Sequence, residues 1–179
     1  MLTWLKTLST QRRFWLFMAF SAFVLEMTAL YFQYGMNLAP CVMCVYERAA
    51  LFAILGVGLF GTLAPNFILT RIITILLGMI SAVKGLSIAI KHTDYQLHPG
   101  PWNQCSAFAD FPKSLPLDKW IPALFQPYGE CSDVVWSFLG LSMAQWIAVM
   151  FAGYLIIFFM LFFSQFVRTR RRNRMLFTK

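Results

Sequence analysis

Long apolar segments dominate the pattern of hydrophobic and polar positions along this chain. Four of them approach the roughly 20 mostly apolar residues that an α-helix needs to cross a hydrocarbon layer about 30 Å thick. The second is the shortest, and its three glycines suit a membrane helix, where glycine is common. The pattern predicts an all-α membrane protein built as a four-helix transmembrane bundle. The spans are expected at about residues 14–33, 45–64, 72–90 and 146–163.

The composition supports this fold class. Hydrophobic residues make up 59% of the 179 residues and charged residues only 12%, which excludes a water-soluble enzyme. The first apolar segment has a basic start like a secretory signal peptide, but it is too long and carries Glu26, so we interpret it as a retained helix. No internal repeat is apparent, and we treat residues 1–179 as a single integral membrane domain.

Basic residues gather on one side of the predicted bundle. The formal net charge is +8, and ten Lys and Arg residues, with no acidic residue among them, flank both termini and the loop at 65–71. Because basic flanks stay in the cytoplasm during insertion, we expect both termini to be cytoplasmic and the loops at about 34–44 and 91–142 to lie on the non-cytoplasmic side. The basic run at 168–174 is typical of an anchor on anionic lipid, so no nucleic-acid partner is predicted.

All four cysteines fall in the predicted non-cytoplasmic loops. An even number of cysteines in an oxidising compartment favours disulfides. A zinc site usually needs two closely spaced cysteine pairs, so no metal site is predicted. A bridge between Cys41 and Cys44 would constrain almost no chain, and a C-x-x-C pair is more typical of a redox centre. A bridge between Cys105 and Cys131 could simply stabilise the 27-residue loop that it closes.

The segment PCVMCVYER at residues 40–48 strengthens the redox interpretation. If the second helix begins near Cys44, the helix dipole favours an anion there. Arg48 lies one turn further on the same helix face, and both effects favour a thiolate at Cys44. The alternative is that Arg48 only reaches toward the membrane surface and is neutralised by Glu47.

Polar groups elsewhere suggest further candidates. Charged residues inside a membrane are costly and are functional candidates by default. Glu26 and Lys84 lie at similar depth, so Glu26 either relays protons or balances Lys84. His92 lies at the outer end of the third span, level with Cys44. In the long loop, an apolar stripe predicts a short amphipathic helix on the membrane surface, or else a small core under the loop; it comprises Leu117, Trp120, Ile121, Leu124 and Phe125.

Taken together, these residues resemble the bacterial disulfide bond formation protein B family of inner-membrane thiol:quinone oxidoreductases. The resemblance covers nearly the whole chain. It rests on the four spans, on PCVMCVYER entering the second span, on KHTDYQLHP and LPLDKWIP in the long loop, and on GEC and FLGLSMAQW before the last span. Around Cys105 the sequence NQCSAFADFP matches only loosely.

The resemblance implies a role for each cysteine. Cys105 and Cys131 would form the pair that meets a soluble thioredoxin-fold oxidase of the DsbA-like kind, with Cys105 taking the mixed disulfide. Cys41 and Cys44 would oxidise that pair. Electrons would then pass from Cys44 to ubiquinone or menaquinone in the bacterial inner membrane.

The resemblance also implies a quinone site beside Cys44. Arg48 would hold the quinone, with His92 and Met143 as weaker candidates. From its position alone, His92 either donates a proton to the reduced quinone or is an idle histidine at the membrane interface. Two other functions remain open. A four-span quinone or epoxide reductase of the vitamin K type also uses C-x-x-C, although usually late in the chain. A non-enzymatic membrane protein with two structural disulfides would leave the spacing of Cys44 and Arg48 unexplained.

Overall fold

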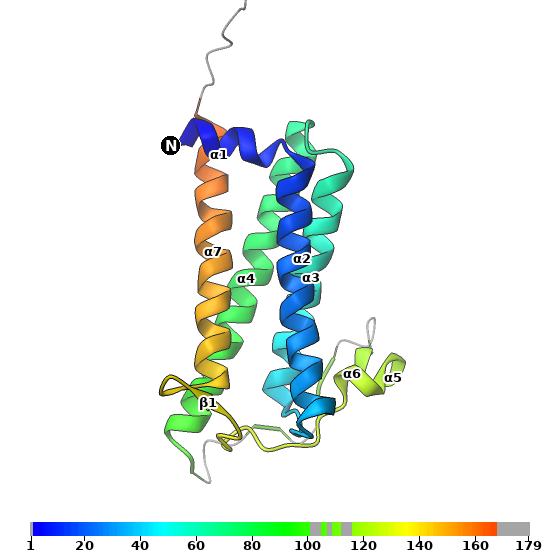
Figure 1. Ribbon diagram of the computed structural model, residues 1–179, viewed down its shortest axis with the longest axis vertical. Helices are drawn as coiled ribbons and strands as arrows, with labels where there is room; N and C mark the ends of the chain where they lie inside the picture. Colours follow the sequence, from blue (N-terminus) through cyan, green and yellow to red (C-terminus); the bar gives the residue numbers. More distant parts are fainter. Residues whose placement is uncertain (1, 101–104, 107–108, 112–115, 168–179) are drawn as a thin grey trace, which may run out of the picture.

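Four long helices run side by side in the computed structural model, which describes residues 2–100, 105–106, 109–111 and 116–167 (Figure 1). Each helix is long and apolar enough to cross a membrane. The chain is therefore an all-α, multi-pass membrane protein, as the hydrophobic pattern predicts. The helices are α2 (Arg12–Leu30), which the π-helical turn η1 (Tyr31–Gly35) continues, α3 (Val42–Leu63), α4 (Ile68–Leu97) and α7 (Met143–Phe166).

The helices extend beyond the apolar segments of the sequence. The third span was expected at about residues 72–90, but α4 runs over Ile68–Leu97. Its additional turns carry Arg71, His92 and Tyr95, all of which are buried. The apolar segment of a sequence marks only the part of a helix that lies in the hydrocarbon layer. The helix continues beyond it, because packing against neighbouring helices also buries polar residues nearer its ends.

A short helix at the N-terminus, α1 (Leu2–Ser9), lies across one end of the bundle (Figure 1). Lys6 Nζ donates hydrogen bonds to the carbonyl oxygens of Gln165 at 3.2 Å and Val167 at 2.7 Å. A lysine suits the last carbonyls of α7, which have no partner inside the helix. Trp15 Nε1 donates to the Ser9 carbonyl at 2.9 Å and holds α1 against α2. The position of this end in the cytoplasm stays a prediction.

The core between the helices depends on small residues, because a lipid environment drives helix association through close packing rather than through hydrophobic burial. A Cβ added to Gly58 of α3 would lie 2.8 Å from the backbone nitrogen of Ala19 in α2. At Gly85 of α4 an added Cβ would collide with the ring of Phe151 in α7. These glycines let α2 approach α3, and α4 approach α7.

The long loop forms two short helices where one was predicted. They are α5 (Leu117–Trp120) and α6 (Pro122–Phe125), and they lie near the beginning of α3 (Figure 1). Pro122 lacks the N–H that would continue α5, and it occupies the first position of α6. The apolar stripe divides accordingly: Phe125 is buried against Phe52 and Phe111, whereas Trp120 is 61% exposed. Membrane attachment of the exposed part stays a prediction.

A two-residue hairpin leads into the last span. Strands β1 (Ser137–Phe138) and β2 (Leu141–Ser142) pair antiparallel, and the turn between them holds Leu139 and Gly140 at positive φ. Ser142 then caps α7 in a reciprocal box with Gln145. Ser142 Oγ also donates to Gln96 Oε1 of α4 at 2.6 Å, and this bond fixes the start of α7 against the end of α4.

We expect Gly58→Ala to destabilise the protein by about 1–3 kcal/mol, because the new methyl group meets backbone atoms that cannot move aside. Gly56→Ala in the same helix is the matched control, since nothing lies within 4 Å of the Cβ that it adds. Thermal unfolding in detergent should therefore show a lower Tm only for Gly58→Ala. Equal Tm values for the two variants would contradict the close approach of α2 and α3.

Candidate active site

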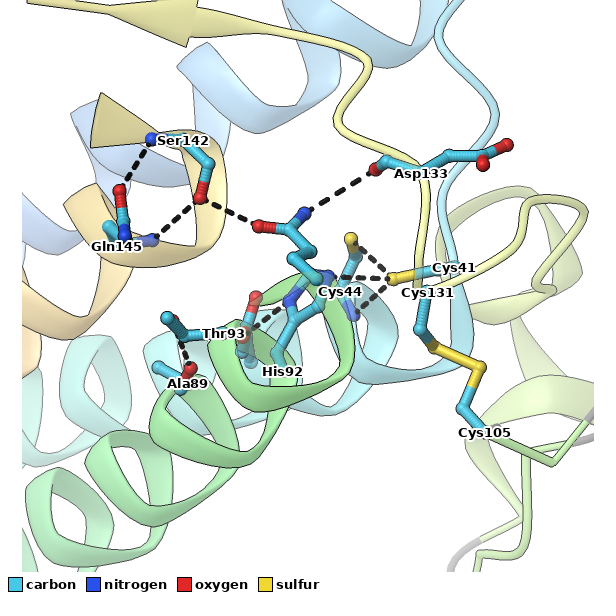
Figure 2. Close-up of polar contacts among 12 residues, drawn as sticks. Cys41, Cys44, Ala89, His92, Thr93, Cys105, Cys131, Asp133, Ser142 and Gln145 are labelled. Atoms are coloured by element: carbon cyan, nitrogen blue, oxygen red, sulfur yellow. Dashed lines mark hydrogen bonds and ion pairs between the residues drawn. A yellow bond between two sulfur atoms is a disulfide. The ribbon is translucent and has the colours of Figure 1, made fainter. Parts of the chain in front are cut away.

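The two cysteine pairs lie in one buried cluster, although more than 60 residues separate them in sequence. Cys41 and Cys131 are 3% and 2% exposed, while Cys44 and Cys105 are half-buried at the edge of the cluster. In Figure 2, Cys41 lies between Cys44 and the disulfide of Cys131 and Cys105. The fold thus brings all four predicted cysteines together.

Backbone hydrogen bonds hold the two loops against each other. The carbonyl oxygen of Pro40 accepts from the N–H groups of Tyr128 at 2.9 Å and Gly129 at 3.0 Å. Cys41 and Gly129 form an isolated parallel bridge. A Cβ at Gly129 would collide with the carbonyl oxygen of Ala39, so this close approach requires glycine.

The two pairs differ in redox state. Cys105 and Cys131 form a disulfide with an S–S distance of 2.06 Å. Cys41 and Cys44 are free, and their sulfur atoms lie 2.8 Å apart. The second pair is therefore oxidised while the first pair is a dithiol.

The sulfur at the helix N-terminus belongs to Cys41, not to Cys44 as the sequence analysis expected. Helix α3 begins at Val42, and Cys41 is its N-cap, with Sγ accepting the backbone N–H of Cys44 at 3.3 Å. The pKa of Cys41 is lowered chiefly because the Cys44 thiol donates a hydrogen bond to its sulfur, with help from the N–H groups of Cys44 and Met43. These contacts outweigh burial and the nearby Glu47, which act in the opposite direction.

His92 lies against the first cysteine pair. Its Nε2 is 3.5 Å from Cys41 Sγ (Figure 2). Its Nδ1 is 3.0 Å from Glu47 Oε1. Both His92 and Glu47 are buried, at 3% and 1% exposure. From the sequence, His92 was expected at the quinone site, and Glu47 was considered only as a residue that could neutralise Arg48. The one sign of the true contact was that Glu47 follows Cys44 by three residues and so lies near it on α3.

Arg48 pairs with Glu26, which corrects the suggested pairing of Glu26 with Lys84. The distance from Arg48 Nε to Glu26 Oε1 is 2.9 Å, and both side chains are almost fully buried. Lys84 is exposed on α4, because α2 packs beside α3 and Lys84 lies on an outer face of its own helix. The pair is close but not aligned: neither Glu26 oxygen accepts a hydrogen bond from any described residue.

Arg48 also connects the end of α2 to the long loop. Its Nη1 donates to Gln33 Oε1 at 2.8 Å and to the Leu124 carbonyl at 2.6 Å. Within the described part of the chain, Nη2 donates no hydrogen bond, so it can serve another acceptor. Neither Gln33 nor Leu124 was predicted as a site residue, because only the folded loop brings them to Arg48.

Two adjoining cavities extend from Cys44 into the bundle. The first, of about 70 Å³, is lined by Cys44, Glu47 and Arg48 among others. The second, of about 330 Å³, lies between α2 and α7, is lined mostly by apolar side chains, and reaches the exposed residues Thr28 and Met150. Both cavities are lined by Ala29, Phe32, Leu51, Met143 and Ile147. Met143 thus lies where the sequence analysis placed it, near Cys44 and Arg48, whereas His92 lines neither cavity.

Two more cavities lie on the side of the disulfide. A cavity of about 100 Å³ is lined by Cys41, Cys44 and His92 together with Gln96 and Asp133. Another, of about 370 Å³, lies beside the disulfide, and its lining is both polar and apolar. Its lining includes Cys105, Tyr128, Glu130, Cys131 and Ser132.

Comparison with known proteins shows the family of this chain. The family model for disulfide bond formation protein DsbB matches residues 11–161. The chain belongs to the DsbB family. It is 56% identical over 177 residues to disulfide bond formation protein B of Histophilus somni (strain 129Pt), with 99% of each chain covered. The same protein of Mannheimia succiniciproducens is 55% identical over 177 residues, again 99% of both chains, and that of Haemophilus influenzae (strain ATCC 51907 / DSM 11121 / KW20 / Rd) is 44% identical over 175 residues, 98% of this chain and 99% of that protein.

We expect the thiolate of Cys41 to persist at lower pH when residue 44 can donate a hydrogen bond. In protein with Cys105 and Cys131 replaced by serine, Cys44→Ser keeps a donor and Cys44→Ala removes it. The pH midpoint of Cys41 alkylation by iodoacetamide should therefore be higher for Cys44→Ala, because the contact that most lowers the pKa of Cys41 is lost. Identical midpoints would show that the thiol contact does not control this group.

Proposed function

We propose that this DsbB-family protein is a thiol:quinone oxidoreductase of the bacterial inner membrane. It reoxidises a soluble periplasmic DsbA-like thioredoxin-fold oxidase and passes the electrons through its two cysteine pairs to ubiquinone or menaquinone. The observation that carries the proposal is the position of Cys44. It lines one cavity with Cys41 and another with Arg48 that adjoins the apolar cavity between α2 and α7.

The first exchange takes place at the second pair. Cys105 is the more accessible sulfur of the disulfide, because Cys131 is 2% exposed. A thiolate of the reduced partner attacks Cys105, the bond to Cys131 breaks, and Cys131 leaves as a thiolate. The partner's second thiolate then attacks the mixed disulfide, which releases the oxidised partner and a Cys105 thiol. The cavity of about 370 Å³ beside the disulfide can receive the partner's segment.

The second exchange passes the electrons inward. Cys131 attacks Cys41 of an oxidised first pair, and Cys44 leaves as a thiolate. Cys105 then attacks Cys131 and releases Cys41, so the second pair is again a disulfide and the first pair is a dithiol. This is the distribution of bonds in the structure. The Pro40 carbonyl and the bridge at Gly129 keep the two pairs within reach.

The residues near Cys44 fit a quinone. The apolar lining between α2 and α7 suits an isoprenoid tail, and exposed residues at its edge allow entry from lipid. Arg48 Nη2 is available to donate to a carbonyl oxygen, and Met143 lies where the cavities meet. When bound, the quinone supplies the acceptor for two electrons and two protons. Glu26 stays the candidate proton relay, because it is buried beside Arg48.

Purely structural disulfides explain the site less well. A disulfide between Cys41 and Cys44 would close a loop of only four residues and would therefore stabilise the fold little, whereas the pair lines a cavity together with His92. The family match likewise favours this reaction over that of the vitamin K type.

The decisive assay is anaerobic. Purified protein in lipid is mixed with a reduced DsbA-like protein and ubiquinone, and partner thiols are followed together with quinone absorbance. We expect the two to fall in step, and Cys44→Ser to abolish both changes. If thiols and quinone are untouched with ubiquinone and again with menaquinone, the proposal is wrong.

We expect Arg48→Lys to raise the KM for quinone about 10–100-fold, since a charge-assisted hydrogen bond contributes about 1.5–3 kcal/mol. Formation of the mixed disulfide at Cys105 should be unchanged. Arg71→Lys is the matched control, because Arg71 is also buried, at 6% exposure, but lies near the beginning of α4. An unchanged KM in Arg48→Lys would remove Arg48 from the quinone site.

A further inference from the structure

The side chains of Cys41, Cys44 and His92 form a group that the disulfide chemistry alone does not explain. One ligand atom from each lies within 4.8 Å of the other two, at the wall of a cavity of about 100 Å³. We propose that, when the first pair is reduced, these three residues bind a thiophilic divalent cation of the Zn²⁺ class. The bound ion holds the first pair in its dithiolate form.

The distances suit tetrahedral coordination. Zn–S bonds of about 2.3 Å and Zn–N bonds of about 2.0 Å place a sulfur and a nitrogen ligand about 3.5 Å apart and two sulfur ligands about 3.8 Å apart. Cys41 Sγ and His92 Nε2 are already 3.5 Å apart. The two sulfurs are 2.8 Å apart, so one thiol must rotate outward by about 1 Å. Cys44 can do so, because it is half-buried at the cavity.

Glu47 prepares His92 for this role. A histidine ligand usually donates its second ring N–H to a carboxylate, which fixes the tautomer and increases the basicity of the other nitrogen. Glu47 Oε1 lies 3.0 Å from His92 Nδ1, which leaves Nε2 directed at Cys41 (Figure 2). The Glu47 carboxylate, the His92 imidazole and the proposed metal position therefore already lie in the required order.

Charge balance also favours the ion. Binding of M²⁺ to the Cys41 and Cys44 thiols releases two protons and forms a neutral unit with two thiolates and an imidazole. A neutral unit is tolerated in a buried site where isolated charges are not. The cavity beside these three side chains, which Gln96 and Asp133 also line, leaves room for a fourth ligand such as water.

Binding is limited to one redox state of the protein. A disulfide between Cys41 and Cys44 removes both thiolate ligands, so oxidised protein has no site. Conversely, the bound ion occupies the sulfurs that must be reoxidised. This effect on turnover rests on the proposed function, whereas the binding itself does not.

The test measures Zn²⁺ binding without partner or quinone. Protein carrying Cys105→Ser and Cys131→Ser is reduced anaerobically with a phosphine and titrated with Zn²⁺ against a chelating dye, while proton release is recorded. We expect one Zn²⁺ and two protons per chain, and no binding after oxidation of the first pair. Cys41→Ser should abolish the tight site, and Glu47→Gln should weaken it about 10–100-fold.

His92→Ala decides between this site and a simple dithiol. It should weaken binding at least as much as Glu47→Gln, whereas His98→Ala, which alters an exposed histidine just after the same helix, should leave binding unchanged. Circular dichroism and Tm verify that each variant is folded. Equal affinity in His92→Ala, or equal binding to oxidised protein, would overturn the proposal. If Zn²⁺ binds as expected but the quinone assay is blank, the site stands and the proposed function fails.

Discussion

The arrangement of this protein depends on one carbonyl group. Pro40 has no N–H, but its carbonyl oxygen accepts two backbone hydrogen bonds from Tyr128 and Gly129 of the long loop. This contact puts Cys41 in the same buried cluster as Cys131. Without it, the two cysteine pairs would belong to separate loops, and exchange between them would require a chance encounter of the two loops.

Neighbouring residues of α3 divide the site into two halves. Because successive side chains on a helix point about 100° apart, Glu47 turns toward α4 and contacts His92, while Arg48 turns toward α2 and contacts Glu26. The Glu47 side contains sulfur and imidazole ligands. The Arg48 side opens into the apolar cavity between α2 and α7. Cys44 lies between the two halves and lines a cavity on each side.

Sequence patterns predicted the parts of the site whose signal is local. The C-x-x-C pair and its place at the beginning of a span are visible in residues 40–48, and the number of spans follows from apolar length. The same reasoning failed where contacts join distant segments. Similar depth suggested Lys84 as the partner of Glu26, whereas the structure pairs Glu26 with Arg48. Depth in the membrane can be counted along a helix, but the direction of a side chain depends on how that helix is rotated in the bundle.

The sequence by itself determined the fold class, since unpaired backbone groups are so costly in hydrocarbon that an apolar segment of this length must be helical. It also predicted, through the family resemblance, that the four cysteines form two redox pairs. Only the tertiary structure decided that His92 contacts Cys41 and that Cys41 caps α3. It also decided that Arg48 pairs with Glu26 and donates a hydrogen bond to the Leu124 carbonyl. The physical reason is that hydrophobicity acts on each segment separately, whereas hydrogen bonds between segments exist only after the helices and loops have packed.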